Sequence, residues 1–134
     1  MSQAAGSRPL SFLAFDFGLK RTGAAVGNTL LGQAQPLKTL RAEGDARFAA
    51  IEALIREWQP DALVVGVPLH PDGAPHENTH RARRFARQLH GRFRLPVHEV
   101  DERYTTTAAA ESGASDLDAA AAALILDQFL RGLA

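Results

Sequence analysis

The sequence contains no cysteine, so disulfide bonds and thiolate metal sites are both excluded. It has no apolar run near the ~20 residues that a membrane-spanning helix requires, and no membrane span is therefore predicted. It has neither a Walker P-loop nor a Gly-x-Gly-x-x-Gly motif, the common phosphate-binding loops of nucleotide enzymes. The formal net charge over 134 residues is zero, which gives the whole molecule no overall attraction for polyanions.

The composition is that of an ordinary globular protein. Hydrophobic residues make up 46% of the chain and charged residues 22%, which argues against general disorder. We expect one domain over residues 10–134, preceded by a flexible tail at residues 1–9. The short apolar stretch at residues 10–15 runs directly into Asp16, as a strand does and a signal peptide does not, so the protein is expected in the cytoplasm.

Hydrophobic periodicity predicts an α/β fold. Three short strands are followed by a helix, and strands and helices then alternate along the chain. Asp45 and Pro60 are the expected cap and stop of the first helix, and Pro75 is the expected start of the second. A three-stranded meander followed by alternating elements requires a five-stranded mixed sheet, antiparallel first and then parallel, with helices on both faces. The predicted strands are residues 12–15, 22–26, 31–37, 62–67 and 97–100, and the last two predicted helices are residues 105–112 and 116–130.

Three acidic residues stand where elements of this sheet begin or end. Asp16 follows the first strand, Glu102 follows the fifth, and Asp118 lies at the start of the last helix. The carboxyl ends of parallel strands share one side of a sheet, where ligands gather, so these side chains are candidates to converge. Three converging carboxylates suit two Mg²⁺ ions and phosphate chemistry, because hard cations prefer carboxylate oxygens.

Each of these acidic residues also has a purely structural interpretation. Asp16 can cap its own turn through an Asx-type hydrogen bond. The Asp-Glu-Arg sequence at residues 101–103 can form a surface ion pair, and Ser115 with Asp118 matches a capping box. Taken one at a time, the residues do not decide between structure and chemistry.

The charges are unevenly distributed along the chain. Residues 81–94 contain six arginines and no acidic residue, which produces a local positive field although the whole chain is neutral. Such a field favours contacts with nucleic-acid phosphates, but a helix face that merely meets solvent shows the same pattern. The arginines are Arg81, Arg83, Arg84, Arg87, Arg92 and Arg94.

One further motif indicates a zinc protease. Residues 76–80 read His-Glu-Asn-Thr-His, which is the HExxH spacing of that class, and His98 or Glu99 would be the nearby third ligand. Pro75 places the motif in the first turn of an arginine-rich helix, where the backbone is least fixed. This interpretation is therefore the weaker one.

A second motif indicates an ATPase. Asp16-Phe17-Gly18 followed by Gly23 resembles the phosphate hairpin of actin-like and sugar-kinase ATPases. Those enzymes close two such domains over a nucleotide, whereas this chain is long enough for one. A nucleotide-binding fragment is accordingly the least favoured hypothesis.

Four sequence blocks stand in a fixed order: LAFDFGLKRTG at residues 13–23, VGVPL at 65–69 with DG at 72–73, DERYTT at 101–106 and DAAAA at 118–122. Together they resemble the YqgF/RuvX family, Holliday-junction resolvases that are also assigned to maturation of precursor small-subunit ribosomal RNA. The resemblance extends over nearly the whole chain, from residue 11 to residue 130.

The resemblance implies a ribonuclease-H-like fold and a Mg²⁺- or Mn²⁺-dependent endonuclease acting on structured nucleic acid. It implies that Asp16, Glu102 and Asp118 form the acidic, metal-binding triad. It also implies that a set of basic side chains contacts nucleic-acid phosphates. This set is Lys20, Arg21, Arg81, Arg83, Arg84, Arg87 and Arg103.

One segment departs from the family pattern. Family members usually carry a longer segment with glycine and lysine before the last acidic residue, whereas residues 108–117 are short here and contain neither Lys nor Arg. That departure motivates a second hypothesis, a non-catalytic module that binds RNA or the ribosome on the same fold. RNA precursors and branched DNA are both open as substrates. Monomer and homodimer are open as well, and a dimer would favour junction resolution, which needs two active sites.

Overall fold

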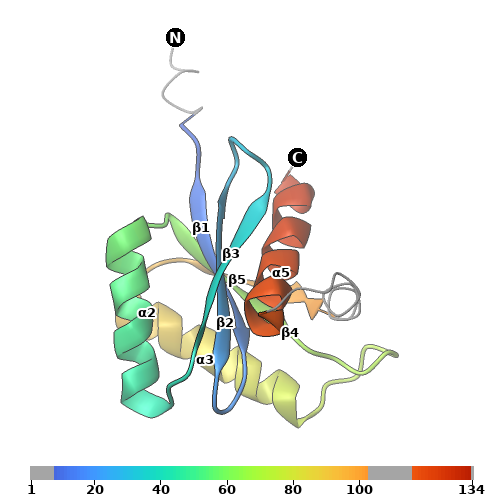
Figure 1. Cartoon of the computed structure of the whole chain (residues 1–134). Coiled ribbons are helices and arrows are strands. Elements are labelled where there is room, and N and C mark those ends of the chain that lie inside the picture. Colours follow the sequence, from blue (N-terminus) through green and yellow to red (C-terminus); the bar gives the residue numbers. More distant parts are fainter. Residues whose placement is uncertain (1–7, 103–115, 134) are drawn as a thin grey trace.

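A five-stranded sheet forms the centre of the computed structural model, which describes residues 8–102 and 116–133 (Figure 1). The strands are β1 (Ser11–Phe17), β2 (Thr22–Asn28), β3 (Ala34–Leu40), β4 (Ala62–Val67) and β5 (Val97–Asp101), and they lie in the order β3-β2-β1-β4-β5. β2 is antiparallel to both β1 and β3, whereas β4 is parallel to both β1 and β5. The predicted mixed sheet is therefore confirmed.

Helices within the described residues cover both faces of this sheet. They are α2 (Gly44–Trp58), α3 (Glu77–Phe93) and α5 (Leu117–Leu133), and α5 lies across the sheet from α2 and α3 (Figure 1). Alternate residues of a strand point to opposite faces. In β1, Leu13 and Phe15 belong to the core formed with α2 and α3, whereas Phe12 and Ala14 belong to the core formed with α5. The predicted arrangement of helices on both faces is confirmed.

Helix α5 is joined to strand β3 near both of its ends. At the start of the helix, the Thr39 hydroxyl donates to the Asp116 carboxylate at 2.6 Å, and the same carboxylate accepts from the backbone N–H of Ala119 at 3.1 Å. Asp116 therefore acts as the N-terminal cap of the helix. Farther along the helix, the Asp127 carboxylate accepts from the backbone N–H of Ala34 at 2.7 Å. The helix and the edge strand are thus held together along their length.

The predicted start of β3 was wrong by three residues, since the strand begins at Ala34 and not at residue 31. The intervening residues form a turn, in which the Asn28 side chain accepts from the backbone N–H of Leu31 at 2.8 Å. Gly32 follows with a positive φ of 68°, a conformation that glycine adopts without steric cost. The apolar Leu31 is consequently exposed in the turn instead of paired in the sheet.

The predicted helix ends also need correction. α2 begins at Gly44, so Asp45 lies in its first turn, and the cap position is taken by Glu43 without a side-chain hydrogen bond. α5 extends to Leu133. The predicted helix at residues 105–112 and the first seven residues of the predicted tail lie outside the described residues, as does Ser115. Within residues 8–102 and 116–133, none of the helices combines the length and the apolar character needed to cross a bilayer.

The HExxH sequence forms a helix cap. The His76 Nδ1 atom accepts from the backbone N–H of Asn78 at 3.2 Å, and the Thr79 hydroxyl accepts from the backbone N–H of His76 at 3.0 Å. These reciprocal bonds are a capping box at the start of α3. In the part of the chain that the structure describes, no three His, Asp or Glu side chains are grouped so as to hold a metal ion there. The zinc-protease interpretation therefore finds no support.

Candidate active site

Asp16 lies near the carboxyl end of β1 and points to the face that α5 covers, because it continues the alternation of the strand. Its partner on β2 is Gly23. On the other side, β1 pairs with β4 as far as Val65, and Gly66 is the next residue along β4. Asp16 is thus flanked by a glycine on each neighbouring strand, and the glycines leave space on this face of the sheet.

The two glycines admit the groups that complete the site. A Cβ atom at Gly66 would lie 2.3 Å from the Oε2 atom of Glu102 and 2.3 Å from Cδ1 of Ile125. A Cβ atom at Gly23 would lie 1.9 Å from the backbone carbonyl oxygen of Asp118. Real Cβ atoms do not come this close to other atoms, so the missing side chains allow Glu102 and the start of α5 to approach the central strand.

Asp16 and Glu102 form a hydrogen-bonded carboxyl pair, and both residues are half-buried. Burial raises the pKa of Asp16 to about 6. The negative charge of Asp118 also raises this pKa, whereas the hydrogen bond with Glu102 lowers it. Burial and the charge of Asp16 raise the pKa of Glu102 to about 8. Two carboxyl groups that are costly to ionise together are well suited to a divalent cation, because the cation compensates both charges.

Asp118 lies beside this pair, but its carboxylate is already occupied. The Nε atom of Arg21 is 2.8 Å from Oδ2 of Asp118, and the Thr39 hydroxyl is 3.5 Å from the same oxygen. Among residues 8–102 and 116–133, no three acidic or histidine side chains are arranged as a complete cation site. The structure therefore brings Asp16 and Glu102 into contact and places Asp118 within electrostatic reach of Asp16, in an ion pair with Arg21.

The donor set fits a hard divalent cation. Mg²⁺ in proteins usually takes one or two carboxylates and keeps several water molecules, so the pair of Asp16 and Glu102 meets its minimum requirement. The Asp118 carboxylate beside the pair would be a further oxygen ligand. Mg²⁺ or Mn²⁺ would also offset the burial and the nearby negative charge that raise the two pKa values.

Arg47 is part of the site region although the sequence analysis did not identify it. This arginine of α2 is only 6% exposed. Its guanidinium donates to the backbone carbonyl oxygens of Gly18 at 2.8 Å and Ala42 at 3.2 Å, and also to that of Leu19. It thereby fixes the turn between β1 and β2, which leads directly from Asp16 into the basic residues of the turn. The signal in the sequence was its spacing, since Arg47 precedes Ile51 by one helical turn on the buried stripe of α2.

Replacement of Arg47 by methionine is expected to lower the free energy of unfolding by about 2–3 kcal/mol, because three backbone carbonyl groups lose their charge-assisted hydrogen bonds to a buried guanidinium. Methionine retains most of the apolar volume of the side chain. Urea denaturation measures the change. The matched control is Arg56→Met on the same helix, where only an exposed ion pair with Glu52 is lost and about 0.5 kcal/mol or less is expected. An equal change in both variants would contradict the structural role of Arg47.

The basic residues are distributed between ion pairs and open surface. Arg81 and Arg83 each lie next to an acidic side chain, at 2.8 and 3.5 Å respectively. Arg84 and Arg87 are exposed, and among the described residues neither has an acidic partner within 4.0 Å. Lys20 is exposed in the turn after β1, and Arg103 lies outside the described residues. The phosphate contacts assigned to these side chains stay predictions.

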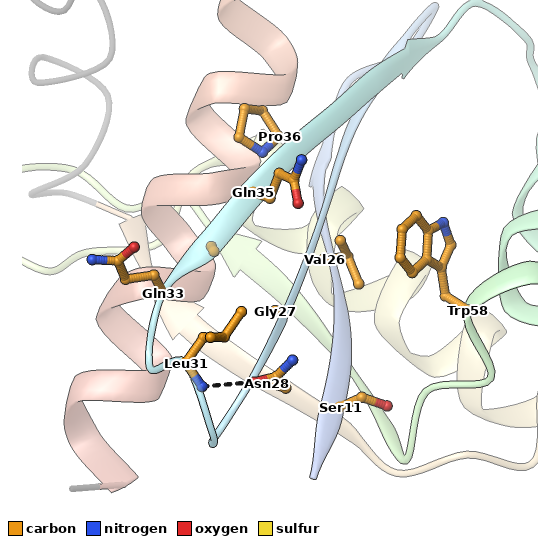
Figure 2. Close-up of a pocket in the computed structure, with 10 residues that line it drawn as sticks. Ser11, Val26, Gly27, Asn28, Leu31, Gln33, Gln35, Pro36 and Trp58 are labelled. Carbon is orange, nitrogen blue, oxygen red and sulfur yellow. Dashed lines mark hydrogen bonds between the residues drawn. The ribbon is translucent and has the colours of Figure 1, made fainter. Parts of the chain in front are cut away.

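A cavity of about 630 Å³ lies where β1 begins and β2 ends, at the opposite end of the sheet from Asp16. Figure 2 shows the residues that line it. It is bounded by Val26 and Gln35 from the sheet and by Trp58 from α2, together with the turn that carries Leu31. None of its ten lining residues is charged. A cation or a phosphate would find no charged partner among these residues. This cavity, although large, is therefore not the candidate reaction site.

Comparison with known sequences gives close relatives over nearly the whole chain. A protein-family model described as "RuvX: Holliday junction resolvase" matches residues 10–132. A protein of Albidiferax ferrireducens named "Putative pre-16S rRNA nuclease" is 72% identical over 123 residues, which are 92% of this chain and 79% of that protein. A protein of the same name from Paraburkholderia phytofirmans is 54% identical over 140 residues, covering 99% of this chain and 95% of the relative.

Comparison with solved structures gives the same fold at low sequence identity. RuvC of Thermus thermophilus in complex with a Holliday junction substrate matches with a TM-score of 0.55 and 16% identity, over 92% of this chain and 95% of that chain. RuvC of the same organism in a second structure matches with a TM-score of 0.53 and 14% identity, over 92% and 96%. At such identities the likeness concerns the fold alone, and it agrees with the ribonuclease-H-like fold expected from the sequence.

Proposed function

The chain belongs to the RuvX family of Holliday junction resolvases, and from this membership we propose that it is a divalent-metal-dependent endonuclease that hydrolyses phosphodiester bonds in structured nucleic acid. The observation that carries the proposal is the half-buried, hydrogen-bonded pair of Asp16 and Glu102 with Asp118 beside it. The carboxylate oxygens of these three residues fit Mg²⁺ or Mn²⁺ as the cofactor.

The side chains divide the work between cation binding and substrate binding. Asp16 and Glu102 would hold the cation, and Asp118 would complete the ligand set. When bound, the cation supplies the positive charge that activates water and stabilises the charge developing on the phosphate. The strands keep the two carboxylates at fixed positions, and the exposed Lys20 and Arg21 contact phosphates on either side of the cleaved bond.

Two classes of substrate follow from the names of the relatives and of the family. Relatives at 54% and 72% identity carry the name of a pre-16S rRNA nuclease, which makes precursor ribosomal RNA the first candidate. The family description makes branched DNA the second candidate. Both present phosphates in bent or branched geometry, and both would bind with a marked dependence on salt concentration.

The decisive experiment offers purified protein an RNA that contains the end of a 16S precursor and, separately, a four-way DNA junction. With Mg²⁺ or Mn²⁺, cleavage of one of them is expected, and chelation of the metal should stop it. Glu102→Gln is the matched variant, because it keeps the shape of the side chain and removes its charge. Salt-sensitive binding without cleavage of either substrate would favour the non-catalytic module and overturn the proposal.

The stability of the metal-free protein is expected to fall as the pH rises from about 4 to about 8. Asp16 and Glu102 have pKa values of about 6 and about 8, above the ordinary values near 4, so the folded state binds their protons more tightly than the unfolded state does. Their stabilising contribution is therefore complete at low pH and is lost as each group ionises. We expect a loss of about 2 kcal/mol across this interval, since one pKa unit corresponds to about 1.4 kcal/mol and both groups keep some access to water.

Urea denaturation of the protein in a chelator, at a series of pH values, measures this dependence. Glu102→Gln should show a clearly smaller decrease, because the group with the most raised pKa is gone. Added Mg²⁺ should restore stability to the native protein above pH 7 and have little effect on the variant. Identical pH profiles for the two proteins would contradict the strained carboxyl pair.

A further inference from the structure

The ion pair between Arg21 and Asp118 sets one acidic residue of the site apart from the other two. Arg21 Nε lies 2.8 Å from Asp118 Oδ2. The Asp118 side chain is 29% exposed and that of Arg21 is 57% exposed, so solvent reaches the ion pair. Asp16 and Glu102, which are both half-buried, bond instead to each other.

The backbone of Asp118 has no freedom to move toward Asp16. Its carbonyl group lies directly on Gly23, where even a Cβ atom would come within 1.9 Å. The first turn of α5 is held by the Asp116 carboxylate, which accepts from Thr39 at 2.6 Å and from the backbone N–H of Ala119 at 3.1 Å. A change in the group that the Asp118 carboxylate binds must therefore come from rotation of its side chain and from movement of the Arg21 side chain.

Arg21 has both the freedom and the space to leave. It is a long, exposed side chain at the start of β2. Beside the ion pair lies a cavity of about 310 Å³, lined by Arg21, Arg41, Leu117 and two carboxylates, those of Asp116 and Asp118. The hydrogen bond from Thr39 lowers the pKa of Asp116, and the positive charge of the nearby Arg41 lowers it further. A phosphate that enters this cavity meets two guanidinium groups, and guanidinium pairs with phosphate in a bidentate geometry.

A guanidinium group on one oxygen of the Asp118 carboxylate weakens cation binding to that carboxylate. Arg21 pairs with Oδ2, and its positive charge repels a cation at the other oxygen. Metal binding at all three acidic residues is therefore favoured when Arg21 exchanges its partner. The phosphate backbone of the substrate is the anion that the proposed function brings to this place.

We propose that Arg21 is a positioning residue that withholds Asp118 from the metal until a nucleic-acid phosphate takes over its guanidinium group. This inference rests on the proposed function. It makes nucleic acid and metal bind cooperatively, because each removes an obstacle to the other. The free protein would then bind its cation weakly through Asp16 and Glu102, and Asp118 would join the ligand set when nucleic acid is bound.

The test is Mn²⁺ affinity of the full chain, measured by calorimetry without nucleic acid. Arg21→Gln is expected to bind Mn²⁺ about fivefold more tightly than the native protein, in the usual range for coupled sites. The matched control is Arg41→Gln, which removes the same charge from the same cavity without breaking the ion pair with Asp118. It should change the affinity much less. Adding Asp118→Asn to Arg21→Gln should abolish the gain.

A second measurement tests the cooperativity directly. A short RNA duplex, shown by electrophoresis to stay intact, should tighten Mn²⁺ binding to the native protein, and the increase should be clearly smaller for Arg21→Gln. Equal gains in Arg21→Gln and Arg41→Gln would indicate a general charge effect and overturn the role of Arg21. No Mn²⁺ binding by any of these proteins, with or without the duplex, would overturn the proposed metal-dependent function and this inference with it.

Discussion

Asp16→Asn is expected to lower the rate of metal-dependent cleavage by more than about 100-fold, because even residues that only orient a metal ligand are typically worth roughly 10- to 100-fold. The same substitution should leave the melting temperature of the metal-free protein equal or higher. Asparagine keeps the shape of the side chain and can still bond to Glu102. It removes a buried charge whose pKa is raised by burial and by the neighbouring charge of Asp118, so the repulsion in the apo site decreases.

Single-turnover cleavage and thermal unfolding, each with and without Mg²⁺, measure the two effects. Mg²⁺ should raise the melting temperature of the native protein and have little effect on the variant. Asp61→Asn is the control, and the expected change in its melting temperature has the opposite sign. The pKa of Asp61 is lowered by its hydrogen bond with Arg8, so the loss of this charge should destabilise the protein slightly while cleavage is unchanged. Full residual cleavage by Asp16→Asn would remove this residue from the mechanism.

Gly23→Ala is expected to lower the free energy of unfolding by about 3 kcal/mol or more, above the usual cost of one additional methyl group in a packed interior. The new methyl group would lie 1.9 Å from the carbonyl oxygen and 2.3 Å from the carbonyl carbon of Asp118. Both are backbone atoms of a capped helix and cannot rotate away as a side chain can. The start of α5 must shift, and cleavage should be lost together with stability because Asp118 moves away from Asp16.

The control for this substitution is Gly91→Ala. Gly91 lies inside helix α3, and a Cβ atom there would meet no other atom within 4 Å. It should therefore raise the free energy of unfolding by about 0.5–1 kcal/mol, since alanine loses less backbone entropy in a helix. Denaturant unfolding of both variants makes the comparison. A Gly23→Ala protein as stable and as active as the native one would show that the helix does not rest on β2 as described.

The sheet and its two covered faces could be predicted because its central strands are continuously apolar. The apolar runs of β1 and β4 are visible in the sequence, and both describe a strand between two layers of helix. The turn before β3 could not be predicted in the same way. Leu31 is apolar and was placed in the strand, but a local hydrogen bond from its backbone to Asn28 and the conformation of Gly32 decide that it stays in the turn.

For the candidate site, the residue types were visible in the sequence but their partners were not. The ends of β1 and β5 lie on the same side of the sheet, which predicts that Asp16 and Glu102 meet. The ion pair that holds Asp118 depends on where Arg21 points, and no sequence pattern specifies the direction of an exposed side chain. The turn contacts of Arg47 were missed for a related reason, because its partners are backbone carbonyl groups that leave no trace in residue identity.

Strand β3 lies at the edge of the sheet, and an edge strand is ordinarily among the first parts of a protein to exchange its amide hydrogens with solvent. Here β3 is hydrogen-bonded to α5 at both ends, through the Thr39 hydroxyl at one end and the backbone N–H of Ala34 at the other. It cannot open locally unless the helix detaches as well. Its amide protons should consequently exchange as slowly as those of the central strands, and a rise in their exchange rate would report that the helix carrying Asp118 has come loose.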